Sequence, residues 1–231
     1  MIYERIMYFL IGLIGNLVIM AFTYSLFFAS PEQLFRTNQE AFILLNVMII
    51  TALLYCLKKY KIVRWQKSSW KELGILLLGV VAVYLTKWGE IFFFPVDIAT
   101  SESTQNIMEI ASRGFTVSFL TTAVILAPML EEIFYRGFMQ KGSFNHSRIG
   151  ILISTGIFAF SHGVSSFSAF LVYFIPGLGI AYSYKLTDNF WIPMAFHILH
   201  NSFPLNEIKG NIEMRMGMCA LSLFLLWKNL Y

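Results

Sequence analysis

The sequence predicts an all-α protein, a polytopic bundle of about eight transmembrane helices. Hydrophobic residues make up 57% of the 231 positions and charged residues only 13%. A soluble domain carries roughly 25% charged residues, so this chain has too few charges to cover a globule with a wetted surface. The apolar residues are also gathered in runs of about the length that crosses a bilayer as a helix.

These apolar runs define the expected helices, at residues 6–28, 41–57, 73–94, 115–138, 149–165, 167–184, 190–206 and 214–230. The first run is longer than the hydrophobic part of a typical signal peptide, and no clear small-residue cleavage site follows it. We therefore expect it to be a retained span. No internal repeat or linker divides the chain, and we expect residues 1–231 to form a single integral membrane domain.

The positive charges predict how the helices are oriented. The loop after the second run is rich in them: Lys58, Lys59, Lys61, Arg64, Lys67 and Lys71. Because cytoplasmic loops carry an excess of Lys and Arg, we expect a multi-pass cell-membrane protein with this loop and the N-terminus in the cytoplasm. The other segments expected on this side contribute Arg5, Lys141, Arg148, Lys185 and Lys228. This distribution explains the net charge of +4 without a nucleic-acid partner.

Two adjacent carboxylates, Glu131 and Glu132, interrupt the fourth apolar run. Neighbouring side chains point about 100° apart on a helix, so the two carboxylates face different surroundings. Glu132 and Arg136 are four residues apart on one face, where they can form an ion pair. Glu131 is then left without a local partner, and Pro128 is expected to loosen the helix and admit water. Taken alone, the segment also allows both carboxylates to lie at the membrane surface near Lys141.

Three of the four histidines also lie in apolar runs, where ionisable residues are rare and usually functional. His162 follows Phe158 by one helical turn, so the two share a helix face. Asn201 follows His197 in the same way. The fourth histidine, His146, lies in a polar loop, where we expect it to be solvated.

Together these polar residues form three patterns on successive apolar runs: Glu131-Glu132-x-x-x-Arg136, Phe158-x-x-x-His162 and His197-x-x-x-Asn201. In this order they resemble the signature of the CPBP membrane proteases, the CAAX prenyl proteases and bacteriocin-processing enzymes also called the Abi family. Gly137 and the stretch 177–193 match as well. The resemblance covers a protease core of about residues 115–205, and residues 1–95 are expected to be accessory spans.

The resemblance implies a helical bundle with a polar intramembrane cavity open to the cytoplasmic side. It implies that Glu131 and His162 activate a water that attacks the scissile carbonyl, while His197 and Asn201 stabilise the oxyanion. A carboxylate beside an imidazole can take a proton from water. Amide and imidazole N–H groups can donate to a developing oxyanion. In this scheme no cofactor is needed, and the supporting residues are Glu132, Arg136 and Phe158.

Zinc is the alternative chemistry. A catalytic zinc site would draw its nitrogen and oxygen ligands from Glu131, His162 and His197, with His200 as a further candidate. The sequence lacks the compact His-Glu-x-x-His arrangement that makes a zinc prediction specific. Cys56 and Cys219 also lack metal-ligand spacing, and we expect both to be small buried hydrophobes.

The expected helix lengths raise a question of depth. If a helix begins near Ser147, His162 lies ~22 Å from its cytoplasmic end, against ~12 Å for Glu131 measured from a helix end near Met139. Groups that act on one water must meet at one depth. The fifth helix therefore begins later than expected, tilts strongly, or breaks near His162 so that the chain turns back.

The substrate expected from the resemblance is a small membrane-bound peptide or protein, cleaved by an intramembrane endopeptidase. Bacteriocin immunity, peptide maturation and peptide signalling are the roles that the resemblance suggests. One rival function is a non-catalytic membrane protein that binds a bacteriocin or a sensor kinase. A second rival is a small transporter whose Glu and His residues relay protons, which predicts such residues along a path rather than in three patterns.

Overall fold

The computed structural model describes residues 2–28, 32–93 and 120–202, and within them we find helices and connecting turns but no β-strand, which confirms the all-α prediction. The helices are α1 (Ile2–Phe28), α2 (Glu32–Lys59), α3 (Trp70–Phe93), η2 (Thr122–Leu126), α6 (Ala127–Glu131), η3 (Glu132–Ser143), α7 (Arg148–Phe160), α8 (Phe167–Thr187) and α9 (Trp191–Ser202). The π-helical segments η2 and η3 continue α6 at its two ends, so the three form one helical rod.

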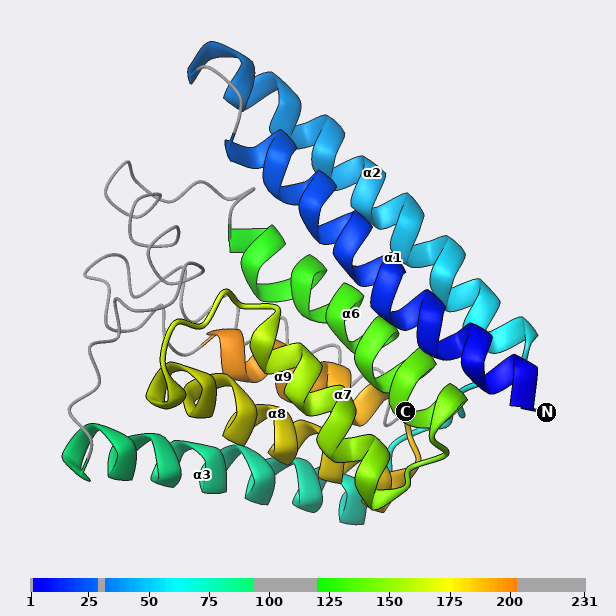
Figure 1. Ribbon diagram of the computed structural model, residues 1–231, viewed down its shortest axis with the longest axis vertical. Coiled ribbons are helices and arrows are strands. Elements are labelled where there is room, and N and C mark those ends of the chain that lie inside the picture. The colour runs from blue at the N-terminus through cyan, green and yellow to red at the C-terminus, as the bar shows by residue number, and fades with distance from the viewer. Residues whose placement is uncertain (1, 29–31, 94–119, 203–231) are drawn as a thin grey trace.

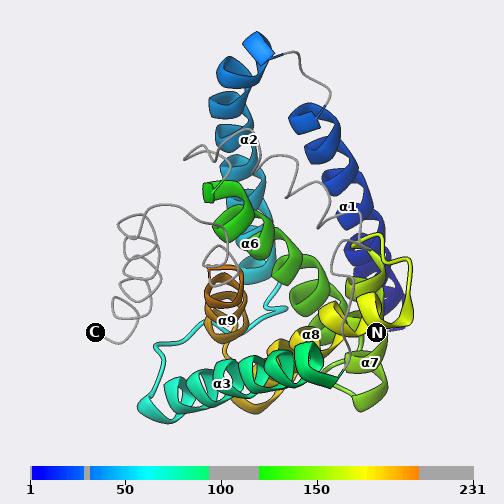
Figure 2. The same cartoon turned by 90° about the vertical axis from the view of Figure 1, so that its left-hand side faces the viewer.

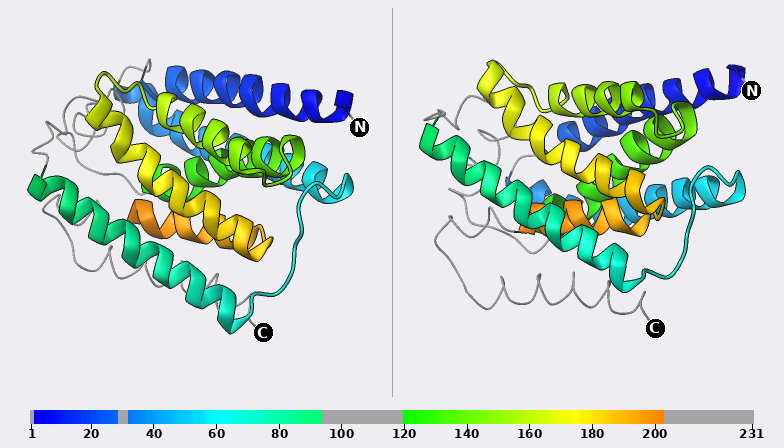
Figure 3. Two further views of the ribbon diagram at one scale, coloured as in Figure 1. Left: turned by 60° about the horizontal axis from the view of Figure 1, so that its bottom comes forward. Right: turned by 90° about the horizontal axis from the view of Figure 1, so that it is seen from below.

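The rod of η2, α6 and η3 lies in the middle of the bundle (Figure 1). The antiparallel pair α1 and α2 packs on one side of it, and α1 makes its main contact with η3. On the other side α7 packs against η3, and α9 packs against α6 (Figure 2). Helix α3 runs beside α8 and α9 on the face away from α1 and α2 (Figure 3).

Seven of the expected apolar runs coincide with helices of the described chain, while the run at 214–230 and Cys219 lie outside the described residues. Two helical segments of the described part are long and apolar enough to cross a membrane: Glu40–Lys59 and Phe167–Thr187. The number of eight spans and the cavity open to the cytoplasm stay predictions.

Pro128 disturbs the central rod, as expected. A proline has no N–H to donate and its ring clashes with the carbonyl four residues earlier, so the chain cannot continue as a regular α-helix through it. The turn before it widens into η2, where the N–H of Ala127 bonds to the carbonyl of Thr122. The wide spacing returns in η3 directly after Glu131. π-helical turns are rare in proteins, and those that do occur frequently lie at functional sites.

The segment between α2 and α3 is fixed to the turn between α8 and α9. Ser69 and Glu72 form a capping box at the start of α3, in which the Ser69 N–H donates to the Glu72 carboxylate at 2.7 Å. The buried Asn189 amide donates to that carboxylate, to the Ser68 hydroxyl and to the Gln66 carbonyl, at 3.2–3.4 Å. This polar contact sets where α9, which carries His197, begins.

His146 is not solvated, contrary to the expectation from its polar loop. Its side chain is only 11% exposed, and its ring packs edge-on against Tyr184 with centroids 4.6 Å apart. The ring nitrogens contact Asp188 and Gln140, both at 3.1 Å. Asp188 ends α8 in the left-handed conformation and also accepts from Lys141 at 2.6 Å. These contacts of Asp188 could not be predicted from the sequence, because the residues that meet there lie more than forty positions from it.

Three segments expected in the cytoplasm meet at one end of the bundle. Arg5 of α1, Lys61 after α2 and Lys141 of η3 line a polar surface cavity of about 270 Å³. Three basic groups from distant parts of the chain therefore face the same region. The assignment of this end to the cytoplasm stays a prediction.

The His146 contact predicts a pH dependence of stability. Burial lowers the pKa of His146 below its ordinary value near 6.5, although the hydrogen bond with Asp188 opposes the shift. Below about pH 6.5 the unfolded chain therefore binds the proton more readily than the folded chain, and stability falls as the pH falls. We expect the melting temperature of the detergent-solubilised protein to drop between about pH 7 and about pH 5. His146→Gln should reduce this drop, and an identical drop in the variant would contradict the assignment.

Candidate active site

A fully buried carboxylate, Glu132, connects two of the sequence patterns. Its Oε2 lies 3.4 Å from Nε of Arg136, and neither side chain is exposed. Its Oε1 lies 2.9 Å from Nδ1 of His197, which α9 brings to the central rod. The expected pair of Glu132 and Arg136 is thus present. The contact with His197 was not expected, because the two residues are 65 positions apart.

Glu131 lies on the other side of the same imidazole. Its Oε2 is 3.5 Å from Nε2 of His197, and the residue is 9% exposed. Because a carboxylate such as Glu132 can only accept, Nδ1 of His197 carries a proton. The contact at Nε2 then holds one proton, either on His197 or on Glu131. A single proton can therefore pass between the two groups over a short distance.

Arg136 extends this arrangement to α8. Its Nη2 donates to the carbonyl of Gly177 at 3.1 Å, and its guanidinium lies 5.3 Å from the ring centroid of Phe158. A Cβ on Gly177 would come within 2.9 Å of the Thr155 side chain and 3.1 Å of the Phe158 ring. Glycine is therefore required where α8 crosses α7, and this close crossing brings the carbonyl within reach of Arg136.

The other glycines that carry the resemblance also lie at helix crossings. A Cβ on Gly137 would meet Leu57 of α2 at 3.0 Å, and one on Gly179 would meet Val83 of α3 at 3.0 Å. Both approaches are tighter than an ordinary side-chain contact. The glycines near the three patterns thus set the spacing between the central rod, α2, α3, α7 and α8.

The ring of Phe158 contacts both histidines. Its centroid lies 4.8 Å from that of His162 and 5.6 Å from that of His197, edge-on in both cases. Tyr135 packs on it edge-on at 5.4 Å. Phe158 is 3% exposed, so its ring excludes water from the space between His162 and His197. This position supports the expectation that Phe158 is a supporting residue rather than a reacting one.

His162 lies in a turn, not in a helix. Helix α7 ends at Phe160, and the chain reverses through Gly163, which has a positive φ of 65°. The chain thus breaks near His162, which is one of the three ways in which His162 and Glu131 can lie at the same depth. Nδ1 of His162 donates to the Phe158 carbonyl at 2.8 Å, because a carbonyl can only accept. The neutral ring therefore keeps its lone pair on Nε2, as a proton acceptor needs.

Tyr173 of α8 holds the other face of the His162 ring. The two rings stack with centroids 4.0 Å apart and an interplanar angle of 23°. His162 is therefore clamped between Tyr173 and Phe158. Sequence reasoning missed Tyr173 because nothing distinguishes it from the other aromatic residues of α8. The only available signal was its place one turn before Gly177.

Asn201 lies one turn after His197, as its spacing predicts. Its Nδ2 donates to the carbonyl of Ala123 in η2 at 3.1 Å. An amide nitrogen has two N–H groups, so this bond orients the side chain and still leaves one donor. The structure thus brings both members of the third pattern to the rod that carries Glu131.

The described residues do not assemble a metal site. Among them, no group of three His, Cys, Asp or Glu side chains is placed to hold a metal ion. Nε2 of His197 faces the Glu131 carboxylate and its Nδ1 is bonded to Glu132. The donor set proposed for zinc therefore does not converge on one point in this arrangement.

Comparison with known proteins gives one family and two curated relatives. Residues 113–203 match the family described as "Type II CAAX prenyl endopeptidase Rce1-like". The chain is 23% identical over 211 residues to "UPF0177 protein YvdC" of Lactococcus lactis subsp. lactis (strain IL1403), covering 88% of this chain and 77% of that protein. It is 24% identical over 188 residues to "Putative membrane peptidase YdiL" of Bacillus subtilis (strain 168), covering 76% and 74%. No solved structure matches.

The buried ion pair predicts a particular pattern of stability losses. Arg136→Met leaves Glu132 buried with one partner fewer, and we expect a loss of roughly 3–5 kcal/mol. The double variant Glu132→Gln/Arg136→Met removes the uncompensated charge and should melt at a higher temperature than Arg136→Met. Thermal unfolding in detergent measures both. A double variant that is less stable than the single one would show that Arg136 does not act through Glu132.

Proposed function

We propose that the protein is a membrane protease that uses Glu131 to activate water, because residues 113–203 match the Rce1-like family of endopeptidases. The observation that carries the proposal is the buried series Arg136, Glu132, His197 and Glu131, in which each group contacts the next. An ion pair with a purely structural role would need only Arg136 and Glu132. The additional imidazole and second carboxylate supply a proton relay.

In the proposed mechanism the proton at Nε2 of His197 leaves Glu131 ionised and ready to act as a base. Water donates a proton to Glu131 while its oxygen attacks the carbonyl carbon of the scissile peptide bond. The tetrahedral intermediate then breaks the C–N bond, and the proton passes to the leaving amine. The products are a new carboxylate and a new amine. His162, which accepts at Nε2, orients the attacking water.

The oxyanion formed in this reaction needs hydrogen-bond donors. The second N–H of Asn201 is one proposed donor. The other is the Nε2–H of His197, which faces Glu131 until that carboxylate takes the proton of the water and can then donate to the oxyanion. Glu132 and Arg136 hold His197 in place from behind, so the donor does not need to reorganise during the reaction. Preorganised donors of this kind are usually a large part of the rate enhancement.

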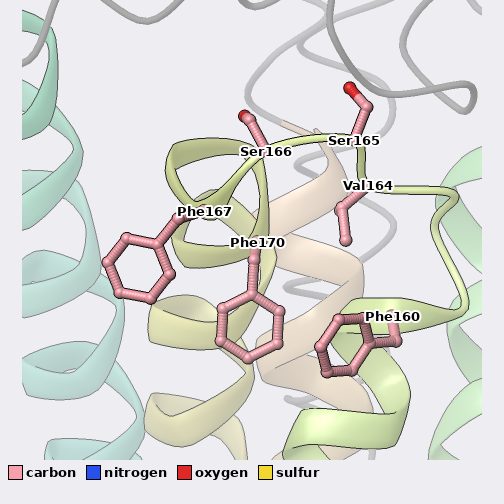
Figure 4. A pocket seen from close by; sticks show the side chains of 6 residues that line it. All are labelled: Phe160, Val164, Ser165, Ser166, Phe167 and Phe170. Atoms are coloured by element: carbon pink, nitrogen blue, oxygen red, sulfur yellow. The ribbon is translucent and has the colours of Figure 1, made fainter.

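An apolar surface cavity at the turn that contains His162 offers a place for the substrate. It has a volume of about 360 Å³ and is lined by three aromatic side chains, Phe160, Phe167 and Phe170, together with Val164, Ser165 and Ser166 (Figure 4). Phe170 is one turn before Tyr173, the residue stacked on His162. An apolar or lipidated segment of a membrane-bound peptide would fill this cavity and bring its peptide bond to the histidine.

The rival functions account for less of this arrangement. A transporter that relays protons predicts acidic and histidine residues strung along a path, whereas these residues gather around Phe158. A binding protein that has lost catalysis has no need for His162 held in one tautomer. Bacteriocin immunity, peptide maturation and peptide signalling remain the proposed settings for cleavage.

The proposal predicts that Glu131→Gln abolishes processing. We expect a loss of roughly 10²-fold or more with unchanged protein level, because the general base is removed. The measurement compares membrane and secreted peptides by mass spectrometry in cells with the wild-type protein, the variant or neither. Glu40→Gln, on an exposed position of α2, is the matched control and should behave as wild type. Unchanged processing by Glu131→Gln would favour the binding protein.

The roles of His197 and Asn201 are separated by a second pair of variants. Asn201→Ala should lower processing by roughly 10²–10³-fold, the cost of one oxyanion donor. Metal analysis of the pure wild-type, His197→Ala and Asn201→Ala proteins accompanies the assay. The metal-free mechanism predicts no stoichiometric zinc in any of them. Stoichiometric zinc that is lost in His197→Ala and kept in Asn201→Ala would replace it with zinc catalysis.

A further inference from the structure

The polar surface cavity at the basic end of the bundle lies where three distant segments of the chain meet. These are the start of α1, the turn after α2 and the end of η3 (Figure 1). Its volume of about 270 Å³ leaves room for a small polar group, since one water takes roughly 30 Å³. Of the described residues that line it, three are cationic and none is acidic. The match to the protease family begins only at residue 113, so it assigns no role to α1 or α2.

The inner side of this cavity is fixed by close packing. Gly142 of η3 lies against Ile62 and Tyr8, and a Cβ on this glycine would come within 3.2 Å of both side chains. Ile62 is 7% exposed and belongs to the largest apolar core cluster, against which Tyr8 also packs. A larger residue in place of Gly142 would push these segments apart. The cavity therefore has a base that the fold itself holds in place.

Lys61 occupies a backbone position that usually belongs to glycine. Helix α2 ends in a Schellman motif, in which the Ile62 N–H bonds to the Leu57 carbonyl at 3.0 Å and the Lys61 N–H to the Lys58 carbonyl at 3.1 Å. Lys61 is the left-handed residue of this motif, with a φ of 52°. A residue with a Cβ is disfavoured in this conformation. The chain thus keeps a less favourable backbone at the point where a basic side chain lines the cavity.

The three cations of the cavity are not neutralised to the same extent. Lys141 is paired with Asp188 at 2.6 Å. Within the described chain no ion pair joins a carboxylate to Arg5 or Lys61, and both residues are exposed. Like charges that face one cavity repel each other, and an anion between them offsets this repulsion. The uncharged polar residues of the lining add hydroxyl and amide groups that can donate to the same anion.

The surface of α1 next to the cavity is apolar, which favours a lipid over a soluble anion. Ile2, Ile6 and Met7 are exposed on the same turns of α1 as Arg5. A soluble anion has no use for these side chains. A phospholipid can bring its phosphate to the cations and lay its acyl chains along the exposed apolar residues. Basic pockets between membrane helices are known to bind lipid headgroups.

We propose that this cavity binds the phosphate group of an anionic phospholipid, with Arg5 and Lys61 as its charged partners. A zwitterionic headgroup carries a cation beside its phosphate, which these basic residues repel. The bound lipid joins α1 and the end of α2 to the rod that carries Glu132. The proposal is independent of the peptidase chemistry, because no residue of the cavity belongs to that site.

The test is native mass spectrometry of the full-length protein in detergent micelles, with phosphatidylglycerol or phosphatidylcholine of the same acyl chains added in known amounts. We expect one phosphatidylglycerol to bind in preference to phosphatidylcholine. Arg5→Gln/Lys61→Gln should weaken phosphatidylglycerol binding roughly thirtyfold, the effect of two basic groups near an anionic lipid. Arg64→Gln/Lys71→Gln is the matched control. It also removes one arginine and one lysine, at exposed positions outside the cavity, and should bind as the wild type does.

Lys61→Gly separates lipid binding from folding. Glycine suits the left-handed position, so we expect this variant to melt at the wild-type temperature or above it in detergent without lipid. Its affinity for phosphatidylglycerol should still fall roughly fivefold, the effect of one basic group. A damaged fold cannot produce this combination. Unchanged affinity in this variant would contradict the role of Lys61.

Three results would overturn the proposal. Equal weakening in the two double variants would show a general attraction of the basic end for anionic lipid rather than a site. Equal binding of the two lipids by the wild type would show that the headgroup charge is not recognised. Inorganic phosphate, added as a competitor, separates a lipid headgroup from a free anion. We expect it to leave the lipid bound, and displacement of the lipid by phosphate at an equal concentration would show a site for a soluble anion.

Discussion

The site depends on one buried negative charge, that of Glu132. A carboxylate taken fully out of water is costly unless charged partners and hydrogen bonds compensate it. Here Arg136 lies on one side of it and His197 on the other. Arg136 lies four residues further along the same helical rod, whereas His197 reaches the carboxylate only because the folded bundle brings α9 to this rod. The placing of His197 against Glu131, and with it the proposed chemistry, follows from the need to satisfy this charge.

The surrounding fold meets that need by departing from regular helix geometry. The central rod is π-helical on both sides of Glu131, and Pro128 accounts for the wide turn that precedes it. Gly177 lets α8 approach α7 closely enough for its carbonyl to accept from Arg136. The turn after Phe160 places His162 beside Phe158 rather than deeper along a helix. Each departure costs some helix stability, and each one positions a group of the site.

The sequence was sufficient for the helices and for the pair of Glu132 and Arg136, because both depend on local spacing. It also singled out the polar residues that the structure brings into contact, Glu131, Glu132, Arg136 and His197, since polar groups are rare in apolar runs. It could not reveal the contact of His197 with Glu132, the burial of His146 or the stacking of Tyr173 on His162. These depend on helix crossings between residues far apart in the chain, and apolar periodicity carries no information about such crossings.

In the proposed mechanism everything depends on Glu131 activating water for peptide-bond cleavage. The most direct test uses purified wild-type and Glu131→Gln proteins in lipid nanodiscs, with membrane peptides from cells that lack the protein, in water enriched in ¹⁸O. We expect the wild type to convert specific peptides into fragments whose new carboxyl terminus carries ¹⁸O, and Glu131→Gln to leave the same peptides intact. Equal labelled cleavage by both proteins, or no cleavage by either, would contradict it.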